Sequence, residues 1–265
     1  MTIISRRSLM KGAAAGAGLA IGGAPLSLMA KGIDDLIIAY NVNLPNWDPT
    51  VGMSAVNPTI QGIYQSVFDM FIHQSPDLAP APGLITEWGW NDDKTGFWVE
   101  VREGVKWHNG DDFGPEDVAY TWQRSGNPEN GSPLAQTWGN IQDIQIDGNR
   151  ITAKMMQFDP MMFKWMYFLT GYCLPKKYLE KVGAEGFEAA PIGTGPYMVE
   201  KFERNAFVRL KANPNYWGGE PAFKSVTIKF VTDAASRVAE IESGNAHVSI
   251  EMPYEEFDRL KGSNG

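Results

Sequence analysis

Residues 97–122 read FWVEVREGVKWHNGDDFGPEDVAYTW, and this stretch predicts a strand, a turn and a helix in succession. Its first part, Phe97 to Arg102, is apolar with polar residues alternating at one end, which is typical of a strand. His108-Asn109-Gly110-Asp111 has the composition of a turn. Pro115 then suits the first position of a helix, and the two acidic residues after it lie beside the positive end of the helix dipole. We expect this helix to face inward with Val118, Ala119 and Trp122.

The same reasoning extends along the chain and predicts a mixed α/β protein. Helices are expected over residues 57–71, 158–169, 233–243 and 253–261. Strands are expected over 35–40 and 225–231, over 248–250, and in a hairpin over 144–153 that turns at Asp147-Gly148. Because a strand, a helix and a strand follow one another from residue 225 to 250, we expect these two strands to form a parallel pair.

Composition excludes several classes of protein. The chain has 265 residues, of which 43% are hydrophobic and 20% charged, so it can bury a sizeable core. Its net charge of −8 repels polyanions, so nucleic acid is not expected as a partner. Cys173 is the only cysteine, which rules out an intrachain disulfide and favours a small packed apolar residue.

Residues 1–30 have the pattern of an export signal. Arg6 and Arg7 lie in an S-R-R-x-L-x-K frame, followed by an apolar run rich in Ala and Gly. The frame resembles a twin-arginine signal. The run is too short and too rich in Gly for a membrane anchor, and no cysteine is placed to carry a lipid. We therefore expect an exported, periplasmic protein.

The residues that carry chemistry are scattered. His73, His108 and His247 each stand alone, without a second ligand at metal-binding spacing, so neither a metal nor a cofactor is expected. Ser54 and Cys173 are the candidate nucleophiles of an exported hydrolase, although the sequence shows no base near either one. The sequence therefore favours binding over catalysis, and we expect no catalytic residue.

Five stretches together resemble one known family. They are Trp47-Asp48-Pro49, Gly83–Trp88, the stretch 97–122, Pro191–Tyr197 (PIGTGPY) and Asn213–Gly219 (NPNYWGG). In order and spacing they are similar to signatures of the extracytoplasmic solute-binding proteins of ABC importers, in the family that binds peptides or nickel complexes (family 5). The resemblance covers nearly all of residues 35–260. It implies a fold like the type II periplasmic binding proteins.

The resemblance also implies a division of the chain. After the signal peptide (1–30), the first strand of lobe 1 would occupy residues 31–54, and an inserted subdomain of that lobe residues 55–190. Residues 191–265 would be the remainder of lobe 1. Members of the family are about twice as long, so we expect an N-terminal fragment whose second lobe is missing.

The function implied is that of a substrate-binding component that captures di- or oligopeptides and delivers them to ABC permease subunits in the inner membrane. A nickel-, metallophore- or oligosaccharide-binding member of the family is the alternative, and an exported hydrolase is a third. The family builds its ligand wall from the loop after Asp48-Pro49 and from a loop near Leu134. On that basis the predicted ligand contacts are Ser54, Asn57, Leu134 and Trp138.

Overall fold

The structure is a computed structural model that describes residues 33–262 and divides into two compact units. Unit 1 comprises the described residues up to Asn43 together with Glu200–Ala212 and those from Ala222 onward. Unit 2 comprises Leu44–Val199 and Asn213–Pro221. The predicted signal peptide, with Arg6 and Arg7, lies outside the described residues. The expected mixture of helices and strands is confirmed, whereas the division at residues 54 and 190 stays a prediction.

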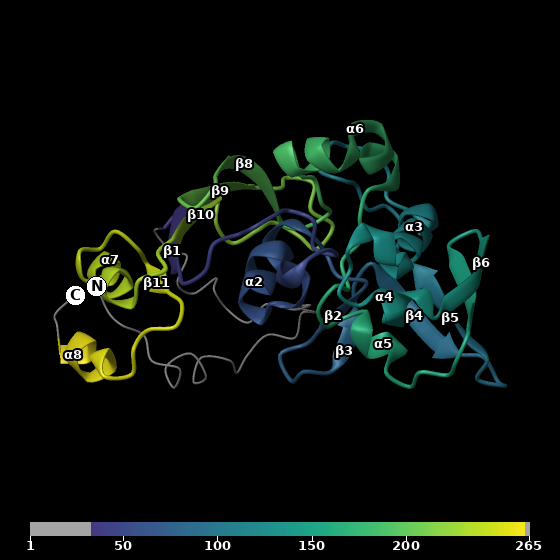
Figure 1. The fold of residues 1–265 in the computed structure, drawn as a ribbon. Helices are drawn as coiled ribbons and strands as arrows, with labels where there is room; N and C mark the ends of the chain where they lie inside the picture. The colour runs from purple at the N-terminus through teal and green to yellow at the C-terminus, as the bar shows by residue number, and fades with distance from the viewer. Residues whose placement is uncertain (1–32, 263–265) are drawn as a thin grey trace, which may run out of the picture. The chain divides into compact units, whose positions relative to one another are not determined.

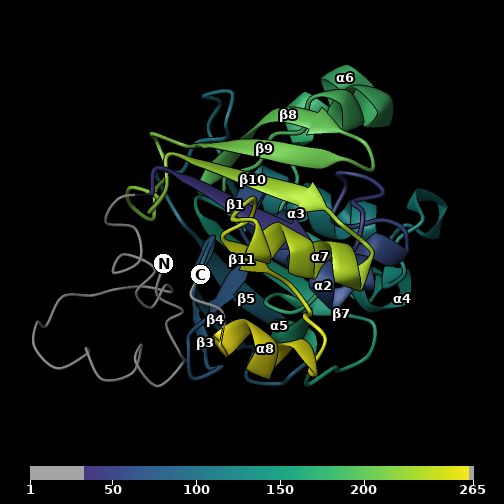
Figure 2. The same ribbon diagram turned by 90° about the vertical axis from the view of Figure 1, so that its left-hand side faces the viewer.

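Unit 1 is built on a five-stranded sheet with the strand order β11-β1-β10-β9-β8 (Figure 2). Its elements are β1 (Asp35–Tyr40), β8 (Tyr197–Glu203, whose first three residues are assigned to unit 2), β9 (Phe207–Ala212), β10 (Ser225–Phe230), α7 (Ala234–Glu242), β11 (Val248–Ser249) and α8 (Glu256–Gly262). Strand β1 runs parallel to β10 along its whole length and parallel to β11 at Ile38 and Ala39. Strand β9 is antiparallel to β10.

The predicted pairing of the last two strands is wrong in one respect. Strands β10 and β11 do point the same way, but β1 lies between them and pairs with both. Helix α7 is therefore a crossover that passes over β1. The pattern along residues 225–250 indicates that the two strands are parallel. It cannot show that β1, from the start of the chain, lies between them, because nothing in 225–250 depends on β1.

Helix α7 begins and ends where the sequence predicts. The Asp233 carboxylate accepts a hydrogen bond from the Ser236 backbone N–H at 2.8 Å, which caps the helix. Gly244, two residues after the last helical residue, has φ +71°, a conformation that glycine adopts without strain.

Unit 2 contains a four-stranded antiparallel sheet of order β4-β5-β7-β6 and a small β2-β3 ladder (Figure 1). Its strands are β2 (Ile72–Gln74), β3 (Pro80–Pro82), β4 (Ile85–Trp90), β5 (Gly96–Val101), β6 (Ile141–Asp147) and β7 (Arg150–Met155). Its helices are η2 (Met53–Val56), α2 (Pro58–Val67), α3 (Pro115–Gly126), η3 (Pro128–Asn130), α4 (Ala135–Gly139), α5 (Met162–Trp165) and α6 (Lys176–Ala189). Among residues 33–262, no helix combines the length and the apolar composition that a membrane crossing requires.

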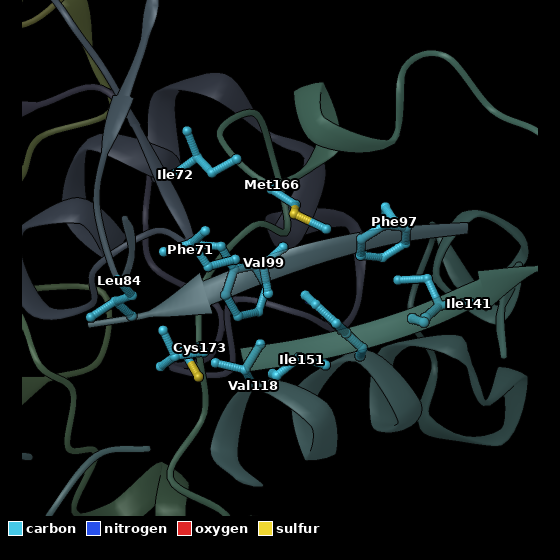
Figure 3. Close-up of a cluster of buried hydrophobic side chains, with 14 of the residues drawn as sticks. Phe71, Ile72, Leu84, Phe97, Val99, Val118, Ile141, Ile151, Met166 and Cys173 are labelled. Carbon is cyan, nitrogen blue, oxygen red and sulfur yellow. The ribbon is translucent and has the colours of Figure 1, made fainter. Parts of the chain in front are cut away.

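The stretch 97–122 folds as predicted and forms the centre of unit 2. Strand β5 buries Phe97, Val99 and Val101, which alternate along it. Helix α3 starts at Pro115, and its buried Trp122 belongs to the same apolar cluster as Val118, which Figure 3 labels beside Ile151. The hairpin β6–β7 also turns at Asp147-Gly148 as expected.

Two predicted helices are shorter than expected. The first is α2, which ends at Val67, because Phe68 leaves the helical conformation and the chain bridges Met70 to Tyr172. In the segment 158–169 only Met162–Trp165 is helical. The spacing of apolar residues did not predict which residues of this segment are buried, since Met162 is buried whereas Phe158 is 42% exposed.

Candidate ligand-binding surface

Two segments of unit 2, residues 46–57 and 127–138, meet in the structure, and we call them the paired loops, although each includes short helical turns (η2 in the first, η3 and most of α4 in the second). The Gly52 backbone N–H donates a hydrogen bond to the Gly131 carbonyl oxygen at 3.0 Å, which joins them directly. The sequence analysis placed ligand contacts on both loops without evidence that they touch. Their contact turns two separate segments into one continuous surface.

A buried ion pair supports this surface from the end of helix α3. Arg124 Nη2 lies 2.8 Å from Asp48 Oδ2, and each side chain is only 13% exposed. Arg124 Nη1 also donates to Thr50 Oγ1 at 2.9 Å, and the Arg124 carbonyl accepts from Asn130 Nδ2 at 3.0 Å. Arg124 therefore holds both loops at once. Because both charges are largely removed from water, the loss of either partner would leave the other uncompensated.

Asp48 also fixes the start of the first loop by a local turn. Its Oδ1 accepts hydrogen bonds from the backbone N–H and the hydroxyl of Thr50, at 2.9 and 2.7 Å. This arrangement is the turn that an Asp side chain forms with the backbone two residues on. Thr50 is fully buried, so the loop is anchored here rather than at its tip.

The tip of the first loop is exposed. Met53 has 77% of its surface accessible, the largest exposure of any large hydrophobic side chain in unit 2. Gly52 and Gly131 beside it are exposed as well, so backbone atoms lie near the surface. The exposed part of the paired loops thus combines a flexible, polarizable thioether with exposed backbone at Gly52 and Gly131.

Ser54 and Asn57 use their side chains within the first loop. The Ser54 hydroxyl accepts from Asn46 Nδ2 at 3.0 Å, and Ser54 is 4% exposed. Asn57 caps helix α2, where its Oδ1 accepts from the Thr59 backbone N–H at 3.0 Å. Both residues therefore set the shape of the loop, and direct contact with a ligand stays a prediction for each.

Leu134 and Trp138 lie on the second loop and differ in exposure. Leu134 is half-buried and packs against the apolar cluster of unit 2. Trp138 is 1% exposed, and its indole N–H donates to Thr170 Oγ1 at 2.9 Å. The Thr170 backbone N–H donates in turn to the Ala55 carbonyl at 3.4 Å, so Trp138 supports the first loop from below. Its contact with a ligand stays a prediction, and in this structure its ring lies in the core.

The sequence did not single out Thr50 or Met53 of these loops, or Arg124 of helix α3, as parts of the site. A cation in the last turn of α3 is favourable for the helix dipole, which explains Arg124 without naming its partner. Asp48 lies 76 positions earlier in the chain, so only the folded structure reveals the pair.

The two candidate nucleophiles of a hydrolase are not arranged for catalysis. Burial raises the pKa of the Cys173 thiol, and Asp117 nearby raises it further, so the thiolate is disfavoured. Figure 3 shows Cys173 near Val118 in the buried cluster, in agreement with the predicted packed role. The Ser54 hydroxyl donates to the Val51 carbonyl at 3.4 Å.

Behind the surface, the PIGTGPY and NPNYWGG stretches are held in place by side chains of unit 2. Neutral His108 accepts from the Gly193 N–H at 3.1 Å, and its Nε2 contacts the Gly195 carbonyl at 3.0 Å. Burial lowers the pKa of His108, which favours this neutral form. A Cβ on Gly193 would lie 2.0 Å from the Val67 carbonyl oxygen, so only glycine fits.

A carboxylate anchors the second stretch. Asp69 is 4% exposed and accepts from Trp217 Nε1 at 2.7 Å and from the Tyr216 hydroxyl at 3.2 Å. The Arg102 guanidinium lies 4.2 Å from the centre of a Trp217 ring. These contacts give the Tyr-Trp pair a structural role, because both polar tips are satisfied by one buried carboxylate.

Comparison with known proteins identifies the family. Residues 79–265 match the family model described as bacterial extracellular solute-binding proteins, family 5 Middle. The chain belongs to this family. The resemblance drawn from the sequence is therefore confirmed, and the relatives described next are named as binding proteins.

Among similar proteins are the glutathione-binding protein GsiB of Shigella flexneri and that of Salmonella typhi, each 28% identical to this chain. The matches cover 92% and 84% of the chain but only 47% and 43% of those two proteins. The chain thus spans less than half the length of these relatives.

Solved structures share the fold. NikZ from Campylobacter jejuni, in complex with Ni(L-His), is 23% identical with a TM-score of 0.79, over 87% of this chain and 46% of that one. The dipeptide-binding protein from Pseudoalteromonas sp. SM9913, in complex with Met-Leu, is 21% identical with a TM-score of 0.78, over 87% and 50%. The predicted fold class, like one lobe of a type II periplasmic binding protein, is confirmed.

Proposed function

We propose that this chain is part of the periplasmic substrate-binding component of an ABC importer that captures short peptides. The complete protein delivers its ligand to permease subunits in the inner membrane, and no bond is made or broken. Membership of a family of extracellular solute-binding proteins supports this reading. So do the glutathione-binding relatives, because glutathione is a tripeptide.

The observation that carries the proposal is the joining of the paired loops by the Gly52–Gly131 hydrogen bond and the Asp48–Arg124 ion pair. A surface fixed in advance loses little conformational freedom when a ligand binds, which favours affinity. In our proposal a peptide lies along the exposed tip, with its polar groups near Gly52 and Gly131 and an apolar side chain against Met53. Ser54, Asn57, Leu134 and Trp138 shape or touch this surface.

Native mass spectrometry of the gene product isolated from its own cell envelope is the first test. We expect a retained adduct with the mass of a short peptide. Deletion of the gene should then abolish uptake of a labelled form of that peptide, and restoring the gene should recover it. A bound oligosaccharide or nickel complex in place of a peptide, or unchanged uptake, would contradict the proposed substrate class.

A substitution at the loop tip tests the proposed surface separately. Met53→Ala should weaken peptide binding by about 1 kcal/mol, roughly fivefold, because it removes an apolar contact. Met156→Ala is the matched control, since Met156 is 71% exposed in the same unit but lies outside the paired loops. Equal affinities of the two variants in calorimetry, with the gene product as the cell makes it, would remove the paired loops from the binding site.

A further inference from the structure

Helix α6, which packs against α3 (Figure 1), consists of two helical segments that meet at Gly183. This glycine has φ +71° and ψ 179°, a non-helical conformation that glycine adopts without strain. The second segment is held in unit 2 by Phe187, which is 1% exposed. Its ring centre lies 6.2 Å from that of Phe68 and 6.3 Å from that of Tyr178. The packing of Phe187 therefore fixes the position of the residue that follows it.

That residue, Glu188, holds the backbone of Trp47. Its Oε2 accepts a hydrogen bond from the Trp47 backbone N–H at 2.6 Å. Glu188 is half-buried and Trp47 is fully buried, so the bond lies largely out of water. Hydrogen bonds that a carboxylate accepts are shorter and stronger than those between neutral groups. The two residues are 141 positions apart, so this bond connects α6 to a distant part of the chain.

Trp47 lies at the base of the first paired loop, and two other helices hold its neighbours. The Asn46 carbonyl accepts a hydrogen bond from the Tyr64 hydroxyl of α2 at 3.0 Å. Asp48 forms its ion pair with Arg124 of α3. Three consecutive residues are thus bound by α2, α6 and α3, so the base of the loop is held from three sides of its backbone path.

The position of this base determines where the tip of the loop lies. Asn46 Nδ2 donates to Ser54 Oγ at 3.0 Å, so residues 47–53 form a closed loop. Near its tip, the Gly52 N–H donates to the Gly131 carbonyl at 3.0 Å. A short loop whose ends are joined has few conformations, so a shift of its base also moves Gly52 relative to Gly131.

We propose that Glu188 is a positioning residue for the paired loops. Its carboxylate holds the Trp47 N–H so that the Gly52 N–H meets the Gly131 carbonyl before a ligand arrives. Glu188 acts through Trp47 and does not touch the ligand. The effect on affinity rests on the function proposed above, since a surface formed in advance loses little conformational freedom on binding. The effect on the bond between the loops is independent of that function.

Amide hydrogen exchange of the gene product as the cell makes it, resolved to single amides, measures the effect on the loops. In Glu188→Ala we expect the Gly52 amide to exchange about tenfold faster, because its bond to Gly131 opens more often. The Trp47 amide proton, observed by NMR after nitrogen-15 labelling of tryptophan, should move upfield because it loses a charged acceptor. Glu185→Ala is the matched control, since Glu185 is an exposed glutamate of the same helical segment and should leave both amides unchanged.

Two comparisons separate positioning from a general loss of stability. If Glu188 only stabilised the end of α6, the Ala190 amide, which donates to the Gly186 carbonyl, would exchange faster and the Gly52 amide would not. Glu188→Gln keeps an oxygen acceptor, so it should restore most of the protection of Gly52. Where Glu188→Ala does not fold, Glu188→Asp takes its place, because its carboxylate is one methylene closer to the helix and should also speed the exchange of Gly52.

Calorimetry with trialanine as the probe measures the consequence for binding. We expect affinity to fall about fivefold in Glu188→Ala and to stay unchanged in Glu185→Ala. A wild-type protein that binds no trialanine would count against the proposed peptide function, and the exchange of Gly52 would still decide the role of Glu188. Unchanged exchange of Gly52 in folded Glu188→Ala, or exchange in Glu188→Gln as fast as in Glu188→Ala, would overturn the positioning role.

Discussion

Replacing Arg124 by methionine should remove the side-chain contacts that connect the first of the paired loops to helix α3. The substitution keeps a long apolar stem and removes the guanidinium that bonds Asp48 and Thr50. At 2.8 Å, and with an effective dielectric constant of about 20, the gross attraction of the ion pair is roughly 6 kcal/mol. Desolvation of both charges opposes it, so the net effect must be judged from burial.

Because the pair is largely buried, the free-energy cost of removing one partner should lie near the upper end of the range measured for ion pairs. Both side chains are 13% exposed, and losing one partner of a buried pair costs about 3–5 kcal/mol, whereas an exposed pair contributes about 0–1 kcal/mol. Asp48 keeps its two hydrogen bonds from Thr50, which lowers the cost. We therefore expect Arg124→Met to reduce the free energy of unfolding of unit 2 by about 2–3 kcal/mol.

Urea unfolding followed by tryptophan fluorescence measures this change selectively. All nine tryptophans lie in unit 2, so the signal reports this unit. In a double-mutant cycle with Asp48→Asn we expect a coupling energy of about 1–3 kcal/mol. Lys154→Met is the control, because Lys154 pairs with Asp143 at 67% and 63% exposure and should cost less than about 1 kcal/mol. A coupling below about 0.5 kcal/mol, or equal costs of the two variants, would refute the reasoning.

Three further predictions concern the scaffold behind the surface. Burial lowers the pKa of His108 in the folded state, so the unfolded chain binds the proton more readily, and the free energy of unfolding of unit 2 should fall as the pH drops below about 6.5. Urea midpoints measured from pH 5 to 8 should show this slope in the wild-type protein and lose it in His108→Gln. An unchanged slope in the variant would mean that another group causes it. Gly193→Ala should cost about 1–3 kcal/mol in the same assay, because its Cβ meets the Val67 carbonyl, and a neutral result would mean that the loop shifts freely. Asp69→Asn should cost about 1–3 kcal/mol and alter the emission of Trp217, whose N–H loses a charged acceptor; a spectrum identical to wild type would contradict the contact.

Local patterns predicted those elements whose signals lie within a few residues. Strand β1, the start of α3 at Pro115, the cap of α7 at Asp233 and the turn at Gly148 each depend on neighbours in the sequence, and the structure confirms them. Helix α2 ended early because a bridge to Tyr172, far along the chain, takes over at Met70. The exposed Phe158 shows that an apolar residue does not by itself reveal burial.

For the candidate site too, the sequence predicted some features and the structure alone revealed others. The sequence pointed to the two loops through a family resemblance, and the structure brought them together by the Gly52–Gly131 bond. The sequence did not predict that Arg124 supports these loops, because an ion pair between residues far apart in the chain produces no pattern in the sequence. Nor did it predict that the Trp138 ring would be buried, since an aromatic residue has the same appearance in a core and on a surface.

By itself, the sequence determined the class of fold through short-range periodicity, and it indicated the family through motifs that resemble the family's signatures. Only the tertiary structure decided that β1 separates β10 from β11, that Arg124 fastens two loops, and that Glu188 of α6 holds the backbone of Trp47. The physical reason is that hydrophobic periodicity depends on adjacent residues, whereas strand order and buried charge pairs depend on which distant segments exclude water together.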